Sequence, residues 1–363
     1  MLLLPQLRMG AVRLAAQGAL PVLDQRLRGT RFLAYSARSV LNPPESTGIG
    51  CWSLNPYVGC EFGCSYCYAR FAHRYVVERA RDAGRLTPSE FGALRGPRGW
   101  DGFEHQIFVK QRPAVLAALE RDLARVLARY RRGRREPVLI GTATDPYQPA
   151  ERRFGITRAV LERLAQAPPL AIGLITKSPL VTRDVELLAR LATRHRLTVH
   201  LSLISTRRRL IRIFEPRSPM PHARLRAVRK LVAAGVHAGL LVAPILPGIT
   251  DRSAHLRQLL RTAREHGARC AHPSPLRLYA AVRPVLLPVL ERQFPALVPR
   301  YLAAYRRAED APRAYARGLK DRFARLAAEI GINTNDDRIG DDEPRTAGAR
   351  QLALWNDPPA EEP

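Results

Sequence analysis

The sequence has no long hydrophobic run, since no uninterrupted apolar segment approaches the ~18 residues of a membrane-spanning helix. Of its 363 residues, 46% are hydrophobic and 25% are charged, which is the ordinary balance of a globular protein. This balance excludes a helical membrane protein. It predicts a soluble chain with one large domain or two smaller ones.

Acidic residues are missing from the N-terminal segment, where Asp24 is the first carboxylate. Such a segment raises the alternative of a targeting or secretory sequence. Pro5 and Arg8 interrupt its apolar part, however, and no clear cleavage site follows. We therefore expect a cytoplasmic protein, with no membrane partner, whose N-terminal segment packs on its own domain.

Lysine is scarce, because 55 of the 59 basic residues are arginine, and only 32 acidic residues balance them. Codon bias in a GC-rich genome explains the choice of arginine over lysine. It does not explain the net charge of +27, which favours a polyanionic partner such as nucleic acid. The densest basic segments are residues 129–135 and 207–212, and the alternative for both is a solvated helix end.

Cysteine is also rare, with five residues in the chain: Cys51, Cys60, Cys64, Cys67 and Cys270. An odd number with three members inside eight residues is not the pattern of a secreted disulfide framework. The close group predicts metal ligation, whereas Cys51 and Cys270 are interpreted as small buried residues.

Short apolar segments alternate with amphipathic ones between residues 52 and 277, which is typical of parallel β/α units. The predicted strands are 52–58, 138–142, 171–176, 197–203, 237–243 and 268–272. The predicted helices are 113–133, 179–194, 222–234, 252–266, 286–307 and 312–330. The pattern predicts an α/β protein with a partial (β/α)6 TIM-like barrel, an N-terminal extension and C-terminal helices.

The chain is divided accordingly into an extension (1–50), a core (51–280), a C-terminal helical segment (281–332) and a flexible tail (333–363). In barrels of this kind, the chemistry gathers at the carboxyl ends of the strands. The cysteine group follows the first predicted strand, Asp145 follows the second, Lys177 ends the third and Ser202 lies in the fourth. We expect these groups to meet in one site.

The cysteines are spaced CxxxCxxC on a glycine-containing segment, residues 55–70, which we call the cysteine loop. Three thiolates turned toward one centre suit an iron–sulfur cluster or zinc. Two alternatives to a catalytic cluster remain open. One is a structural zinc site completed by Cys51 or Cys270, and the other is an iron–sulfur electron carrier with a fourth fixed ligand.

The cysteine spacing, with Tyr66 before the last cysteine, resembles the signature of the radical S-adenosylmethionine (SAM) superfamily. Further segments resemble, in order, the spore photoproduct lyase-like, DNA-repair-like family: NPYVGC (55–60), TDPYQPAE (144–151), ITKS (175–178), EP (215–216) and PILPGITD (244–251). The resemblance implies a radical SAM enzyme. In such enzymes a [4Fe-4S] cluster reduces SAM, and the resulting 5'-deoxyadenosyl radical abstracts hydrogen from the substrate.

The resemblance also implies roles for individual residues. Cys60, Cys64 and Cys67 match the cluster ligands, and Tyr68 matches a catalytic tyrosine of the radical relay. Matches to SAM-binding positions are Tyr66, Thr144, Asp145, Lys177, Ser202 and Glu215. Asp145 and Glu151 are interpreted as holding ribose hydroxyls or substrate, and the alternative for Asp145 is a turn residue.

One segment departs from the family pattern. Spore photoproduct lyase has a cysteine that returns a hydrogen atom to the substrate radical, but residues 141–145 here read GTATD and contain no thiol. A nucleic-acid substrate therefore competes with a protein or a small molecule. The resemblance further implies an electron donor of the flavodoxin or ferredoxin type.

Overall fold

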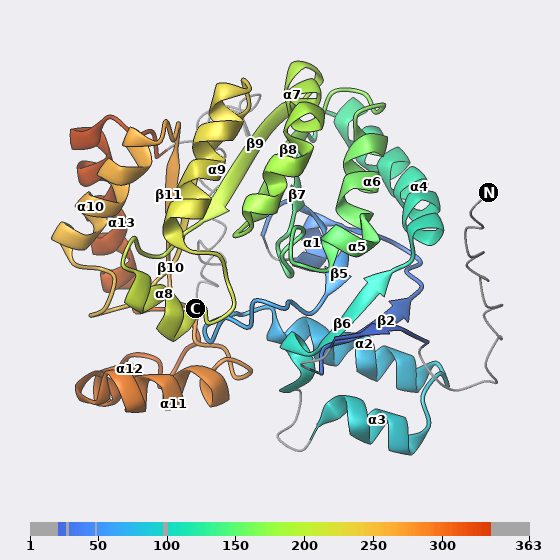
Figure 1. Cartoon of the computed structure of the whole chain (residues 1–363), viewed down its shortest axis with the longest axis horizontal. Coiled ribbons are helices and arrows are strands. Elements are labelled where there is room, and N and C mark those ends of the chain that lie inside the picture. The colour runs from blue at the N-terminus through green and yellow to red at the C-terminus, as the bar shows by residue number, and fades with distance from the viewer. Residues whose placement is uncertain (1–20, 27–28, 48, 97–100, 335–363) are drawn as a thin grey trace, which may run out of the picture.

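The computed structural model describes residues 21–26, 29–47, 49–96 and 101–334 (Figure 1). Most of the N-terminal segment predicted to pack on its domain, and all but the first two residues of the predicted flexible tail, lie outside these residues. Among the described helices, none is both long enough and apolar enough to cross a membrane.

The main sheet contains the six predicted parallel strands and one antiparallel edge strand. In spatial order it consists of β11 (Ala271–Pro275), β10 (His237–Ile245), β9 (Arg196–Ser202), β8 (Ala171–Thr176), β7 (Val138–Ile140), β4 (Trp52–Leu54) and β3 (Leu41–Asn42). Only β3 runs antiparallel to its neighbour. Within the described residues β11 and β3 do not pair with each other, so the sheet stays open. The predicted partial barrel is confirmed.

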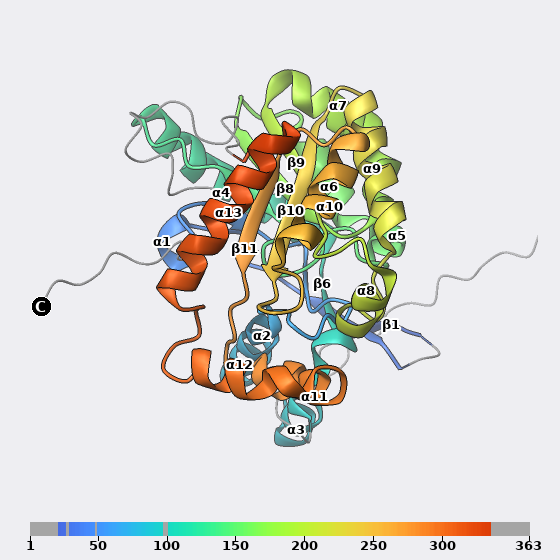
Figure 2. The same cartoon turned by 90° about the vertical axis from the view of Figure 1, so that its left-hand side faces the viewer.

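Helices cover the outer face of this sheet (Figures 1 and 2). They are α4 (Arg112–Arg131), α5 (Glu151–Phe154), α6 (Ile156–Leu164), α7 (Val185–Arg194), α9 (Pro221–Ala233), α10 (Ser253–Glu265) and α13 (Arg313–Ile330). The short helix α8 (Arg208–Phe214) lies instead beyond the carboxyl ends of the strands (Figure 1). In α4 the buried Val115, Leu119, Leu123 and Val126 recur at three- and four-residue steps, which gives the helix one apolar face. In Figure 2, α13 lies beside α10 and β11.

A second, smaller sheet was not expected. It consists of β1 (Val22–Gln25), β2 (Arg31–Tyr35), β6 (Gln106–Lys110) and β5 (Tyr57–Val58), in that order. Beside it lie α2 (Arg70–Asp82), the 3-10 helix η1 (Asp101–Glu104) and α3 (Pro88–Arg95), whereas α1 (Pro44–Thr47) contacts β4 of the main sheet. Val76 and Val77 of α2 pack with Leu33 and Phe108 of this sheet in a core of their own.

The prediction of one continuous strand over 52–58 is wrong. Its first half is β4 of the main sheet, and its second half is β5 of the small sheet. Pro56 stands between them, and its ring nitrogen has no hydrogen to donate to a strand ladder. The cysteine loop consequently starts at the junction of the two sheets.

Two predicted helices are interrupted. The segment 286–307 forms α11 (Arg283–Gln293), the 3-10 helix η3 (Pro295–Leu297) and α12 (Val298–Ala304), because Pro295 disfavours a helical conformation at Phe294. The segment 179–194 begins as the 3-10 helix η2 (Pro179–Asp184) before α7. The other four predicted helices match α4, α9, α10 and α13.

Candidate active site

A pocket lies at the carboxyl ends of the parallel strands, beneath the cysteine loop. Every predicted site residue except Glu151 and Glu215 lines it: Cys60, Cys64, Tyr66, Cys67, Tyr68, Thr144, Asp145, Lys177 and Ser202. We call it the strand-end pocket. The space inside it, open mouth included, is about 980 Å³.

The cysteine loop contains, just before its first cysteine, a position where only glycine fits. Gly59 has a φ of 86°, and a Cβ atom there would lie 2.7 Å from the carbonyl oxygen of Phe103 and 2.8 Å from that of Gln106. This close approach lets the backbone N–H of Cys60 donate to the Phe103 carbonyl at 3.0 Å. The loop is thereby fixed against the turn that precedes β6.

Gln148 holds the cysteine loop from the other side. Its amide nitrogen donates to the carbonyl of Gly59 and to the hydroxyl of Thr144, each at 3.1 Å, and its oxygen accepts from the backbone N–H of Glu61 at 2.9 Å. The side chain is fully buried. Gln148 stands inside a motif that the sequence made conspicuous, but nothing in the spacing indicated this bridging role.

Asp145 organises the ends of two strands. Its carboxylate accepts hydrogen bonds from the Thr176 hydroxyl at 2.6 Å, from the backbone N–H of Lys177 at 2.7 Å and from that of Tyr147 at 2.9 Å. Burial raises the pKa of Asp145, and these donors oppose the rise. The bond to Tyr147 is that of a turn-stabilising aspartate. The other two fix the backbone beneath Lys177.

Lys177 extends across the wall of the strand-end pocket. Its Nζ donates to the Ser202 hydroxyl at 3.2 Å and lies 5.7 Å from the centre of the Tyr66 ring. The structure therefore brings together side chains from the cysteine loop, from the end of β8 and from the end of β9.

Glu215 lies behind Tyr66 rather than in the pocket lining. The Tyr66 hydroxyl donates to its carboxylate, and the guanidinium of Arg224 forms an ion pair with it, with both charged side chains completely buried. Burial raises the pKa of Glu215, but the charges of Arg224 and Lys177 outweigh this effect and lower it. Glu215 is therefore ionised and holds the Tyr66 ring in place. Sequence reasoning assigned no role to Arg224.

Tyr68 lines the pocket and donates its hydroxyl to the backbone carbonyl of Thr142. Its ring lies 6.2 Å from that of Tyr279, and burial raises its pKa. The Thr142 hydroxyl accepts from Asn55 Nδ2 at 3.1 Å. Glu151, by contrast, is not part of the lining, and its carboxylate accepts from Tyr57 and from the backbone of Thr157.

The three cysteines do not form a compact single-ion site in the described chain. Their sulfur atoms do not all lie within 4.8 Å of one another, nor do they form such a group with any other described His, Cys, Asp or Glu. A tetrahedral zinc ion with Zn–S bonds of about 2.3 Å would need sulfurs about 3.8 Å apart. An iron–sulfur cage spreads its thiolates farther. Burial raises the pKa of all three thiols, and a bound metal would favour their ionised form.

The partial barrel and the cysteine-lined pocket at its strand ends define a radical SAM enzyme. The sequence model of the radical SAM superfamily matches residues 54–260, so the chain belongs to that superfamily. Membership implies SAM and an iron–sulfur cluster as cofactors. The resemblance seen in the sequence is confirmed at this level.

Two sets of relatives extend the comparison. Uncharacterized proteins of Mycobacterium tuberculosis and Mycobacterium bovis are 33% identical over 327 residues, which cover 87% of this chain and 88% of theirs. An uncharacterized protein of Methanocaldococcus jannaschii is 25% identical over 219 residues, covering 60% of this chain and 69% of its own.

Among solved structures, spore photoproduct lyase complexed with dinucleoside spore photoproduct has the same fold. The two share 15% sequence identity with a TM-score of 0.55, over 82% of this chain and 79% of the lyase.

Proposed function

We propose that Cys60, Cys64 and Cys67 hold a [4Fe-4S] cluster, and that the chain cleaves SAM reductively in the strand-end pocket to abstract hydrogen from a substrate. When bound, the cluster and SAM supply the electron transfer, the broken carbon–sulfur bond and the carbon radical of this chemistry. The observation that carries the proposal is the convergence of the cysteine loop, Lys177 and Ser202 on one pocket.

The chain's own residues position the reactants. The ammonium group of Lys177 is a compact charge suited to the carboxylate of SAM, and Ser202 directs it through a hydrogen bond. Tyr66, fixed by Glu215, presents an aromatic wall, while Thr144 and Asp145 complete the lining. Tyr68 stands on the lining beside Thr142, and we propose it as the catalytic residue of a radical relay.

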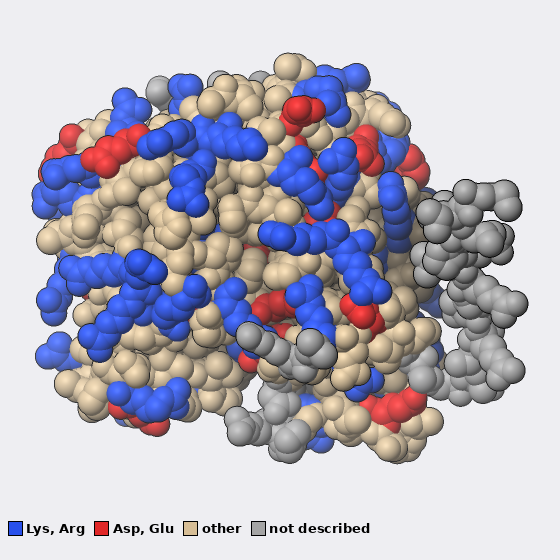
Figure 3. Space-filling view, viewed as in Figure 1, with Lys and Arg blue, Asp and Glu red and all other residues tan. Residues whose placement is uncertain are grey.

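Nucleic acid is the substrate class that we propose. Lys and Arg outnumber Asp and Glu on the face shown in Figure 3. Residues 129–135 contribute less to this charge than expected, because Glu136 pairs with Arg129 and Arg134. The exposed Arg207, Arg208 and Arg209 form no ion pair with a carboxylate of the described chain.

The helix that begins with these arginines, α8, contacts the cysteine loop at its other end. α8 ends at Phe214, whose carbonyl accepts from the backbone N–H of Ser65 at 2.9 Å. Beyond it, the guanidinium of Arg217 would lie 3.0 Å from a Cβ at Gly63. A polyanion bound along α8 would therefore reach the mouth of the site.

Thr142 favours a second substrate class, a protein or small molecule, because it stands where a thiol would return hydrogen to a thymine radical. Binding to DNA and RNA distinguishes the two classes. For a nucleic-acid substrate, affinity should fall steeply with salt, and replacing Arg207, Arg208 and Arg209 by alanine should reduce the log–log slope by roughly 2–3. Absent or salt-insensitive binding would favour the second class.

A radical SAM reaction needs an electron donor and a reducing compartment, and both bear on where the protein works. An electron donor of the flavodoxin or ferredoxin type would reduce the cluster. The five cysteines are all free thiols, as expected in a reducing compartment, and we infer a cytoplasmic location from them.

The experiment for the activity is anaerobic reconstitution with iron and sulfide, followed by dithionite and SAM. We expect 5'-deoxyadenosine from the wild type and only background from Cys64→Ala. Cys51→Ala, which changes a buried cysteine outside the loop, serves as the matched control. Absence of cleavage by the wild type, or full cleavage by Cys64→Ala, would contradict the proposal.

A further inference from the structure

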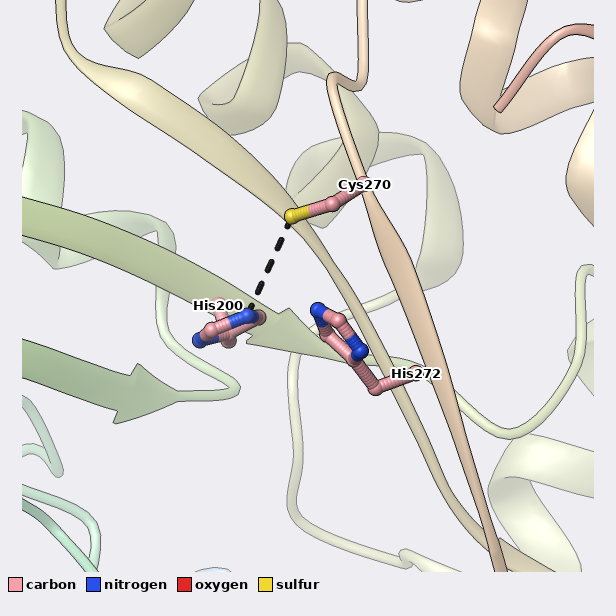
Figure 4. A group of neighbouring side chains, drawn as sticks. All are labelled: His200, Cys270 and His272. Atoms are coloured by element: carbon pink, nitrogen blue, oxygen red, sulfur yellow. Dashed lines mark hydrogen bonds between the residues drawn. The ribbon is translucent and has the colours of Figure 1, made fainter. Parts of the chain in front are cut away.

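A second group of metal-ligand side chains lies inside the barrel, away from the cysteine loop. It consists of His200 on β9, Cys270 just before β11 and His272 on β11 (Figure 4). Their ligand atoms all lie within 4.8 Å of one another, and all three side chains are buried. Cys270 Sγ is 3.9 Å from His200 Nε2. We call this group the His/Cys cluster.

Strand alternation places the His/Cys cluster directly below the strand-end pocket. Ser202 and Ser274 line the pocket, and His200 and His272 stand two residues before them on the same strands. Side chains two residues apart on a strand face the same way. At about 3.3 Å per residue, the two histidines therefore lie roughly 6.6 Å deeper in the barrel than the two serines.

A glycine in the intervening strand makes room for the cluster. β10 separates β9 from β11, and its Gly239 pairs with His200. A Cβ at Gly239 would lie 2.6 Å from Cys270 Sγ and 2.1 Å from the Cys270 carbonyl oxygen. Because this strand has no side chain here, the thiol extends over it and meets an imidazole from the strand beyond.

We propose that His200, Cys270 and His272 bind a zinc ion. Two imidazoles and one thiolate are ligands that zinc prefers, with bonds of about 2.0–2.3 Å that put neighbouring ligand atoms about 3.6 Å apart. The sulfur–nitrogen separation of 3.9 Å is within a few tenths of an ångström of that value. Water occupies the fourth position. The ion ties β9 to β11 beneath the pocket, and this role does not depend on SAM cleavage.

The test is the zinc content of the full-length protein, reconstituted with iron and sulfide, incubated with Zn²⁺ and desalted. We expect one zinc per chain in the wild type and in Cys51→Ser, which alters a buried cysteine outside the cluster. Cys270→Ser and His272→Gln should each contain little zinc. Their affinity for zinc should fall by more than the ~10–100-fold that is typical when a residue hydrogen-bonded to a metal ligand is changed.

Two further measurements keep the result unambiguous if a variant folds poorly. X-ray absorption at the zinc edge of the wild type should report one sulfur and two imidazole ligands, whereas three sulfurs would place zinc in the cysteine loop. Added Zn²⁺ should raise the Tm of the wild type and leave that of His272→Gln unchanged. A wild type without zinc, or variants with full zinc, would overturn the site. SAM cleavage is a separate readout, so either proposal can fail alone.

Discussion

The cysteine loop and the His/Cys cluster offer sulfur ligands at two depths of one barrel, but they are built in opposite ways. The loop gathers three thiols from eight consecutive residues, and their sulfurs stay too far apart for one ion. The cluster gathers ligands separated by up to 72 positions in the chain, and holds them within 4.8 Å. Local spacing thus produces the wide site, and strand pairing produces the compact one.

The largest expected difference between the two groups is catalytic. Cys67→Ala should reduce reductive SAM cleavage to background and lower the iron content, because two thiolates do not retain the cluster we propose. Cys270→Ala should keep its iron and most of its activity. Iron analysis and 5'-deoxyadenosine assays on both variants measure this. Equal losses would mean that the two groups act as one site.

A partly buried cation beside the thiols, Lys177, further distinguishes the site at the cysteine loop. Lys177→Met should raise the KM for SAM by roughly 10–100-fold, the range expected when a charged hydrogen bond of about 1.5–3 kcal/mol is lost. Lys230→Met changes an exposed lysine on α9 and should leave KM unaltered. Steady-state kinetics provide the measurement, and an unchanged KM in Lys177→Met would remove Lys177 from the binding site.

A substitution at Gly239 tests the His/Cys cluster without changing one of its ligands. Gly239→Ala should displace Cys270 and reduce zinc content, and it should lower the free energy of unfolding by about 3 kcal/mol, the upper end for overpacking a core. Chemical denaturation of the zinc-loaded and zinc-free protein separates the two effects. If Gly239→Ala retains zinc, the space that Gly239 leaves for the Cys270 thiol is not needed for binding.

A substitution at Gln148 tests the cysteine loop without changing one of its cysteines. Gln148→Met keeps the volume but removes three hydrogen bonds around the cysteine loop, and should cost about 2–3 kcal/mol of stability, since each bond contributes about 1 kcal/mol. It should also speed the loss of iron to a chelator. Gln166→Met, at an exposed position, is the control. Iron release as slow as in the wild type would show that the loop is held by its other contacts.

Much of the fold was readable because its signals are local. Apolar periodicity and terminal glycines predicted α4, α9, α10 and α13, and short apolar runs predicted the six parallel strands. The small sheet was missed because β5 is two residues long and β2 pairs with β6 across more than seventy residues. Prolines that break β4 from β5 and α11 from α12 were visible, but the surrounding apolar residues masked their effect.

The same distinction applies to the candidate site, where residues in local motifs could be predicted and residues that act through tertiary contacts could not. The cysteine loop, Lys177 and Ser202 could be predicted because motifs and strand ends mark them. Gln148 could not, since it bonds to Glu61, which lies 87 positions earlier in the chain. Arg224 could not, since an arginine nine residues after Glu215 matches no motif spacing. His272 shows no paired ligand spacing in the sequence, and only the order β9, β10, β11 brings it to His200.

The hydrogen bonds that Gln148 makes have a consequence for how the protein matures. A loop that is already ordered by hydrogen bonds to its own chain loses little conformational entropy when it binds metal. We therefore expect the barrel to fold before it is loaded, and cluster insertion to be the last step of its assembly. Its rate would then be set by the delivery of iron and sulfide rather than by folding.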